Sequence, residues 1–409
     1  MIHPKNLVWT AVLGAVLFGA AVYLGDSRKP SQEAAQPGPL VEGLRVRLND
    51  VSGLRVVGAG DKALLSLKRE GERWTVAERA SYPADIDKLR AFLLKLADAQ
   101  RIEPKTQRKE SFAALGVEDV SEPDAKSLQV VLEGLNPEVS LIFGRNPSSG
   151  SGTFVRETGK DQSWLIDQNM AVDSALSNWL QRDLVDIAAT RIASLSITTP
   201  KAKPLQIVPS ADGGMAQFQL AALPRGRELA SEVVVDATAG VFSGLRLDDV
   251  ANASALAVAD DANVTAVTLT TKEGLQLQTR VWDVDGKVWS TWQASLDTAQ
   301  LDAWIEAAQQ REVSAYQARV AAKQSEGAAQ TNGGDARIDE SAAADTKPEP
   351  EPEPLALSQP DQDAAARRKL LEDELQTLQA RFDGRAFQLP VFKAEQLRKS
   401  LDAYLKPKE

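Results

Sequence analysis

The chain has 409 residues, a formal net charge of −10, one histidine and no cysteine. The histidine, His3, precedes the first apolar segment, so the rest of the chain lacks the imidazole and thiol groups of catalytic triads, thiol enzymes and Cys/His metal sites. Ten acidic and two basic residues lie in Glu326–Asp363, which leaves 47 acidic and 45 basic residues elsewhere. This balance gives no electrostatic support for nucleic-acid binding.

The first predicted element is an apolar segment, Leu7–Leu24, whose only polar side chain is Thr10. A helix of this length would span about 27 Å, close to the hydrocarbon thickness of a bilayer. The apolar residues continue past Gly19–Ala21, which favours an uncleaved anchor over a signal peptide. Because the short preceding tail carries Lys5, we expect a single pass through the cytoplasmic (inner) membrane, with the C-terminal part in the periplasm or outside the cell.

A linker is predicted at residues 30–43, between the tail and anchor (1–29) and the folded body. Pro30–Pro39 contains three prolines and one glycine and has no apolar periodicity. Such a segment would separate the folded body from the membrane.

Residues 44–190 are predicted to form a first α+β module. Strands are expected at LRVRL (44–48), at LRVV (54–57) and on both sides of a turn at Glu70-Gly71. A helix should follow Pro83, because apolar residues then recur every three or four positions. Four more strands are expected within 127–134, 138–145, 152–157 and 163–167. A closing helix is predicted from the apolar residues Val172, Leu176, Trp179, Leu180 and Leu184.

The order of elements then repeats, which predicts a second copy of the module in residues 191–295 and 385–409. An offset of 145 residues aligns the apolar residues of the two main helices, and an offset of 221 aligns Leu180 with Leu401 in the closing helices. We therefore expect two similar (duplicated) α+β modules. Chance similarity between two generic α+β segments is the alternative.

The second module is interrupted by residues 296–384, which are predicted to form a helical arm. Apolar residues have helical spacing in two segments, 301–320 and 371–382. If strand 287–294 pairs with strand 386–390, the two helices leave and return at one place and form an antiparallel hairpin with arms about 30 to 40 Å long. The tip, about 327–360, is acidic and Pro-rich, which predicts disorder. It would contact a basic partner or serve only as a solvated tether.

The motifs that are typical of chemical sites are weak. Asn146–Gly152 is rich in small residues but lacks the Gly-Lys-Ser/Thr of a phosphate loop, so a flexible hairpin loop is predicted. Asp283–Gly286 is similar to the start of a calcium loop, yet Ala294 stands where the glutamate is required, so an Asp-Gly hairpin turn is favoured. The sequence therefore assigns no catalytic, cofactor-binding or metal-binding residue.

Three tryptophans, Trp282, Trp289 and Trp292, lie along that hairpin. They would offer a stacking surface for sugars or for another protein, although packing within the sheet is the commoner use of such residues.

Two motifs, REGERWTV (69–76) followed by PADIDKLRAFLLKLADAQ (83–100), and the closing FQLPVFKAEQLRKSLDAYL (387–405), accompany the single N-terminal apolar segment. Together they resemble the bacterial family called domain of unknown function 4340 (DUF4340), over roughly Leu44–Leu405 apart from the arm. That family has no established activity, so the resemblance implies no catalytic residues. Its members are often encoded beside ABC transporter components similar to the gliding-motility type, which implies an auxiliary role in such a complex.

We therefore expect a non-enzymatic, membrane-anchored, envelope-facing accessory or scaffold protein, whose partner is an ABC transporter permease and ATPase. One alternative is an extracytoplasmic ligand-binding protein, for example for glycans, with a cleft between the modules lined by Trp289 or Trp292. Another is a carboxylate-based hydrolase, which would need two acidic side chains about 5 to 9.5 Å apart in one pocket and a raised pKa.

Overall fold

The computed structural model describes residues 37–200, 202–211, 217–256, 263–331 and 352–407. Within these ranges no helix is both long and apolar enough to cross a membrane, and the predicted anchor, Leu7–Leu24, lies outside them. The fold is a mixed α+β one with two compact units. Unit 1 comprises Met1–Glu72 and Ile86–Ala175, and unit 2 comprises Arg73–Asp85 and Leu176–Glu409.

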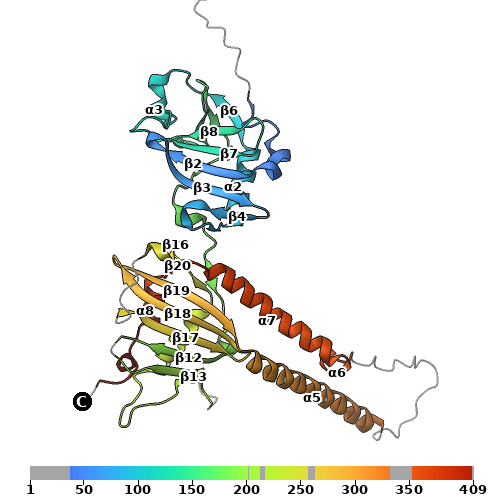
Figure 1. The fold of residues 1–409 in the computed structure, drawn as a ribbon. Helices are drawn as coiled ribbons and strands as arrows, with labels where there is room; N and C mark the ends of the chain where they lie inside the picture. The colour runs from blue at the N-terminus through green and yellow to red at the C-terminus, as the bar shows by residue number, and fades with distance from the viewer. Residues whose placement is uncertain (1–36, 201, 212–216, 257–262, 332–351, 408–409) are drawn as a thin grey trace, which may run out of the picture. The chain divides into compact units, whose positions relative to one another are not determined.

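Unit 1 is built on an antiparallel sheet (Figure 1). Its strands are β1 (Gly38–Pro39), β2 (Gly53–Gly58), β3 (Lys62–Glu70), β6 (Gln100–Pro104), β7 (Leu128–Glu133), β8 (Val139–Phe143), β9 (Thr153–Glu157) and β10 (Ser163–Ile166). They lie in the order β1-β6-β10-β9-β8-β7-β2-β3. All the strands predicted from residue 54 to residue 167 are therefore present. All of them lie in this unit except the strand after the Glu70-Gly71 turn, which is β4 (Arg73–Val76).

Helix α2 (Ile86–Asp98) begins where Pro83 and Asp85 predict it and buries Leu89, Leu93 and Leu96. The strand predicted at residues 44–48 is wrong, because this segment is a 3-10 helix, Leu44–Asp50. Leu44 is buried there, whereas Val46 is 85 % exposed. The alternating pattern does not form a strand because Gly43, with φ of 65°, turns the chain directly before it. A short helix, α3 (Phe112–Leu115), completes the unit.

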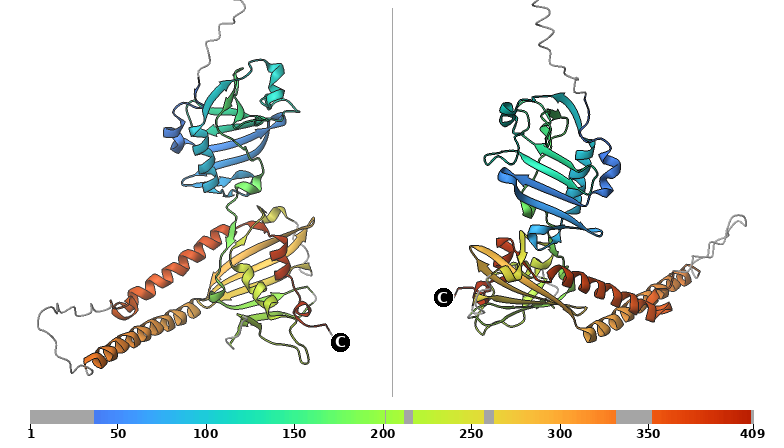
Figure 2. Two further views of the ribbon diagram at one scale, coloured as in Figure 1. Left: turned by 180° about the vertical axis from the view of Figure 1, so that it is seen from behind. Right: turned by 45° about the horizontal axis from the view of Figure 1, so that its top comes forward.

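Unit 2 contains a second antiparallel sheet, seen from two sides in Figure 2. Its strands are β12 (Ile192–Thr198), β13 (Leu205–Pro209), β14 (Phe218–Leu220), β16 (Asp249–Asn252), β17 (Thr265–Thr271), β18 (Leu275–Val284), β19 (Lys287–Leu296) and β20 (Arg385–Gln388). They lie in the order β14-β13-β12-β17-β18-β19-β20-β16. The unit also contains β4, β5 (Tyr82–Pro83), β11 (Asp183–Val185), β15 (Leu245–Arg246), α4 (Glu232–Ala239) and α8 (Val391–Leu397).

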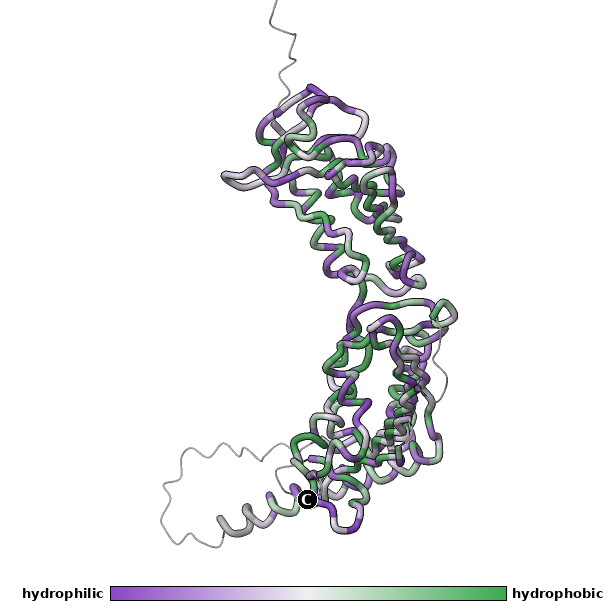
Figure 3. Tube along the Cα trace, turned by 90° about the vertical axis from the view of Figure 1, so that its left-hand side faces the viewer, coloured by the Kyte–Doolittle hydropathy of each residue, from purple (hydrophilic) through white to green (hydrophobic). Residues whose placement is uncertain are grey.

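The two sheets use the same strand order. Unit 1 has the order β6-β10-β9-β8-β7-β2-β3, and unit 2 has the order β16-β20-β19-β18-β17-β12-β13. Each strand of the first order corresponds to the strand at the same place in the second, and corresponding strands also follow one another in the same order along the chain. A main helix precedes β6 in unit 1 and β16 in unit 2. Hydrophobic and hydrophilic residues interchange along the chain trace (Figure 3), and in β17 and most of β18 buried residues alternate with more exposed ones.

Two isolated β-bridges in unit 2 also correspond. Ala84 pairs with Leu180, and Leu229, 145 residues after Ala84, pairs with Leu405. The bridges thus align Leu180 with Leu405, and the predicted alignment with Leu401 is wrong. The predicted closing helix over Val172–Leu184 is also wrong, since this stretch contains a 3-10 turn, Leu176–Trp179, followed by β11. The bridge to Ala84 requires an extended backbone at Leu180, which interrupts any helix there.

The arm begins and ends beside the same strand. β19 pairs with β20 at Trp289↔Gln388 and Ser290↔Phe387, so the condition for a hairpin is met. Between them lie α5 (Thr298–Thr331), α6 (Leu355–Ser358) and α7 (Pro360–Phe382). Both long helices extend away from the sheet (Figure 1). At 1.5 Å per residue α7 is about 35 Å long, as predicted, and α5 is longer, about 50 Å. Most of the predicted tip lies outside the described residues.

The two arm helices are held together near their base. Leu301 and Ile305 of α5 pack against Leu371 of α7 in a buried cluster. Beyond it, Gln309 donates hydrogen bonds to the backbone oxygen of Pro360 (2.7 Å) and to Asp363 (3.0 Å). Later residues of α5 thus contact earlier residues of α7, so the two helices are antiparallel.

Candidate binding site

One face of the unit 2 sheet is polar. Along β12, β17, β18 and β19, alternate side chains enter the core, and those on the opposite face are mostly Ser, Thr and Gln. The register aligns one row of them across five strands: Gln206, Ser196, Thr268, Gln278 and Gln293. None of these five residues is buried. The result is a neutral hydrogen-bonding surface on an ordered sheet.

At its end beside the arm this surface meets a cleft of about 770 Å³, within the range typical of small-molecule sites. Gln278, Gln293 and Ser295 contribute to it from the sheet, and Gln376 and Gln379 contribute from α7. A smaller hollow of about 430 Å³ is lined in part by the same residues, including Gln278 and Gln293. Trp292 and Phe382 are buried and also line both hollows, giving them an apolar base.

The cleft exists because α7 replaces a strand at the edge of the sheet. β20 pairs with β19 only near Trp289 and Ser290, so the later residues of β19 have no strand partner on that side. There Gln379 donates a hydrogen bond from Nε2 to the backbone oxygen of Ala294, at 3.1 Å. The Phe382 ring lies 5.8 Å from the Trp292 ring. These contacts fix α7 against β19 while leaving space above the polar face.

An ion-pair network also holds α7 in position. Arg191, at the start of β12, donates to both carboxylate oxygens of Glu374 at 2.9 Å and to Oε1 of Glu273 at 2.8 Å. The hydrogen bond to Glu374 raises the pKa of Arg191 most, and the hydrogen bond to Glu273 raises it further. The guanidinium therefore remains charged. This network positions the arm.

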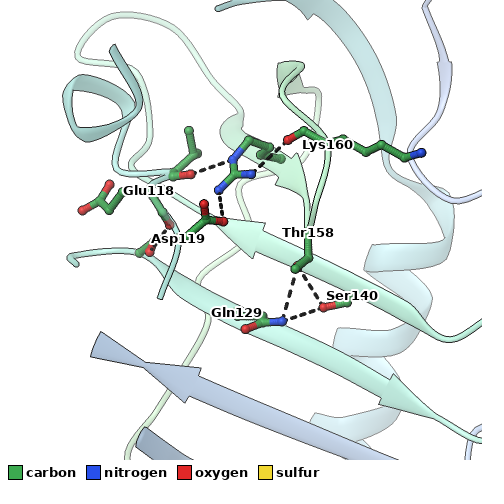
Figure 4. Close-up of polar contacts among 9 residues, drawn as sticks. Glu118, Asp119, Gln129, Ser140, Thr158 and Lys160 are labelled. Carbon is green, nitrogen blue, oxygen red and sulfur yellow. Dashed lines mark hydrogen bonds and ion pairs between the residues drawn. The ribbon is translucent and has the colours of Figure 1, made fainter. Parts of the chain in front are cut away.

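A buried polar network in unit 1 surrounds Arg156, which is 2 % exposed; Figure 4 shows its partners Asp119 and Lys160. Its guanidinium donates to the backbone oxygens of Val117 and Lys160, both at 2.9 Å, and to Asp119 at 2.6 Å. It also lies 4.4 Å from the centroid of the Phe112 ring. Each nitrogen of the side chain therefore has a partner within the protein, which is the arrangement of a structural arginine.

The tryptophans singled out from the sequence are core residues. Trp282, Trp289 and Trp292 are 0 %, 7 % and 3 % exposed. Trp282 and Trp289 pack in one cluster with Val264 and Ala386. Packing within the sheet, the commoner use of such residues, is therefore confirmed for all three. They form no exposed stacking surface, because the pleat turns their rings into packed interiors. Trp292 alone reaches the cleft, as part of its base.

The two weak motifs form turns. Asp285 and Gly286 have φ of 51° and 75° and join β18 to β19, which confirms the predicted hairpin turn. Asn146–Gly152 connects the paired strands β8 and β9, as predicted for a hairpin loop. There Asn146 accepts a hydrogen bond from Thr153 at 2.9 Å.

Among the described residues, the carboxyl groups whose pKa is clearly shifted have a lowered pKa. In the part of the chain that the structure describes, no group of three or more His, Cys, Asp or Glu residues could hold a metal ion. Hydrogen bonding from Lys406 lowers the pKa of Glu228, and hydrogen bonding from Arg367 lowers that of Asp363. A general acid needs a carboxyl pKa shifted in the opposite direction.

Sequence reasoning missed the polar row and the cleft. The repeated Gln residues of LQLQ (275–278) were a usable signal for an exposed strand face. Nothing in the sequence indicated that Gln376, almost a hundred residues later, would face Gln278 across a cleft.

Comparison with known proteins gives one match. Residues 74–263 match the family model described as "Domain of unknown function (DUF4340)", a shorter range than the resemblance suggested. No curated protein and no solved structure matches the chain. Residues 74–263 of the chain thus form a DUF4340 domain.

Proposed function

We propose that this protein is a non-enzymatic, membrane-anchored accessory protein that faces the cell envelope and serves as a binding scaffold for an ABC-type transporter complex. In this proposal Leu7–Leu24 is the anchor, and the two units are duplicated α+β modules. The matching strand orders and the corresponding bridges Ala84↔Leu180 and Leu229↔Leu405 support the duplication. The class of partner comes from the family resemblance.

The observation that carries the scaffold proposal is the surface of α5. Beyond Glu312 no residue of this helix up to Ser325 is buried. Val313, Tyr316 and Val320 recur at helical spacing along one side of it but are only partly exposed, and the short helix α6 packs against α5 as well. The remaining positions of this stretch are exposed, so a long helix that leaves its sheet in this way is suited to contact another protein.

The proposal is tested by gentle detergent extraction of the tagged full-length protein at native expression, followed by mass spectrometry of the co-purifying proteins. We expect an ABC permease and its ATPase at near-stoichiometric amounts. A variant with Leu7–Leu24 replaced by an unrelated membrane helix separates contacts made by the anchor from those of the modules. Recovery of the protein alone would contradict a stable complex.

A second candidate function, ligand binding, is favoured by the cleft between the sheet and α7. Its volume of about 770 Å³ is sufficient for a small ligand. This cleft lies within unit 2, not between the modules as the sequence-based alternative required, and it does not depend on an ABC partner.

A further inference from the structure

Four glutamine side chains line the cleft from three elements, β18, β19 and α7. Gln278 and Gln293 are adjacent in the register of β18 and β19, and Gln376 and Gln379 lie on α7. Within the described residues, no hydrogen bond occupies the side chains of Gln278, Gln293 or Gln376. Each amide offers two donors and one acceptor oxygen, so the cleft presents both kinds of group at several points.

The charge of the cleft favours a neutral ligand. Of the described residues that line the larger hollow, only Asp383 is charged. Two arginines line the smaller hollow, and both have partners within the protein: Arg385 donates to the backbone oxygens of Ala80, Ala380 and Arg381, and Arg280 is also engaged. A phosphate or carboxylate ligand would normally be met by free Arg or Lys groups. Hydroxyl groups, which donate and accept like the amides, fit the lining better.

The edge of the sheet argues against an extended peptide as the ligand. A peptide that adds to a sheet needs free backbone groups along an edge strand. Here α7 lies along that part of β19, and Gln379 already donates to the backbone oxygen of Ala294. Recognition in the cleft must therefore use side chains.

The polar row extends the same chemistry beyond the cleft. Thr268, Ser196 and Gln206 continue from Gln278 across three more strands, and none of them is buried. A chain-like ligand held in the cleft would find hydrogen-bonding groups along this row.

We propose that the cleft between β18–β19 and α7 binds a neutral oligosaccharide through the amides of Gln278, Gln293 and Gln376. The inference rests on the second proposed function, ligand binding, and names its site and its ligand class. The ligand's hydroxyl groups pair with the amides, its apolar ring faces lie toward the base formed by Trp292 and Phe382, and its further units follow the polar row.

The test is isothermal titration calorimetry of the full-length protein in a detergent without a sugar headgroup. The probes are a β-1,4-linked N-acetylglucosamine tetrasaccharide, a β-1,4-linked glucose tetrasaccharide and an uncharged tetrapeptide. We expect at least one saccharide to bind. Gln278→Ala and Gln376→Ala should each weaken its binding by about five- to tenfold, the effect of one lost hydrogen bond.

Matched controls come from the same two elements. Gln276→Ala changes the same face of β18, and Gln362→Ala changes an exposed position of α7; neither residue lines the cleft. Both variants should bind like the unaltered protein. The proposal is overturned if neither saccharide binds at millimolar concentration, if the peptide binds more tightly, or if the cleft and control variants lose affinity equally. Because recovery of an ABC partner is measured separately, none of these results bears on the scaffold proposal.

Discussion

Arg191 and Glu374 form a bidentate ion pair, with Nη1 and Nη2 of the guanidinium each 2.9 Å from a different carboxylate oxygen. The pair joins the start of β12 to the middle of α7, and the same guanidinium contacts Glu273, which is 7 % exposed. The base of the arm is thus connected to the sheet by charge-assisted hydrogen bonds as well as by packing.

Arg191→Ala should lower the free energy of unfolding by about 3 kcal/mol, because it leaves the buried Glu273 without its cation. Urea unfolding followed by tryptophan fluorescence measures the change. Arg246→Ala is the control, since Arg246 forms a solvent-exposed pair with Asp183 at 3.5 Å. Its loss should cost less than about 1 kcal/mol. Equal effects of the two substitutions would contradict the role given to Arg191.

Two buried tyrosines should respond in opposite ways to removal of their hydroxyl groups. The Tyr404 hydroxyl lies 2.8 Å from that of Thr238, whereas the Tyr82 hydroxyl has no hydrogen-bond partner among the described residues. Tyr404→Phe should therefore destabilise the protein by about 1 kcal/mol, and Tyr82→Phe should be neutral or stabilising at neutral pH. Thermal unfolding of both variants distinguishes them, and a larger loss for Tyr82→Phe would refute this account.

Tyr82 should also contribute to unfolding at high pH. Burial raises the pKa of Tyr82 to about 12. Since the folded pKa lies above the unfolded value of about 10, the stability that the neutral phenol contributes is complete below pH 10 and is lost as the pH rises toward 12. Tyr82→Phe should reduce the loss of stability over this interval. An unchanged alkaline profile in the variant would show that Tyr82 does not titrate in this way.

Asp363, which lies between the two arm helices, should make the stability of the protein depend on pH in the acidic range. It is 8 % exposed, and hydrogen bonds from Arg367 and Gln309 lower its pKa. A lowered folded pKa means that its contribution is present above about pH 4 and is lost as the pH falls through the folded value. The stability difference between the unaltered protein and Asp363→Asn should therefore shrink below about pH 4.

Asp373→Asn is the control for that experiment. Asp373 pairs with Lys369 on the exposed surface of the same helix, at 3.1 Å. Its substitution should change stability little at any pH. If the stability difference between the unaltered protein and Asp363→Asn did not change with pH, the proposed contribution of this ionised carboxylate to the stability of the arm would be contradicted.

The spacing of apolar residues correctly predicted those elements that pack with one face against a single neighbouring surface. The spacing of Leu89, Leu93 and Leu96 located α2, and Asp285-Gly286 located the hairpin between β18 and β19. The prediction failed at residues 44–48 and 172–184, where similar apolar spacing serves 3-10 turns and a bridge rather than a strand or a long helix. In those segments tertiary contacts, not local preference, set the backbone.

The candidate site was beyond prediction for a different reason. The row from Gln206 to Gln293 depends on the register of five strands, and a shift of one residue would turn each side chain to the other face. The cleft depends further on α7 returning beside β19 after the arm. Neither the strand register nor the return of α7 beside β19 can be predicted from residue composition and spacing.

The scaffold account is tested most directly by co-purification with a shortened arm. Replacing residues 313–359 by a short Gly/Ser linker removes the projecting part of α5 and the short helix α6 but keeps the cluster of Leu301, Ile305 and Leu371 and the contact of Gln309 with Asp363. The full-length protein should recover an ABC permease and its ATPase at near-stoichiometric amounts, and the shortened protein, with unchanged thermal stability, should recover much less. Recovery of the full-length protein without any such partner would contradict the account.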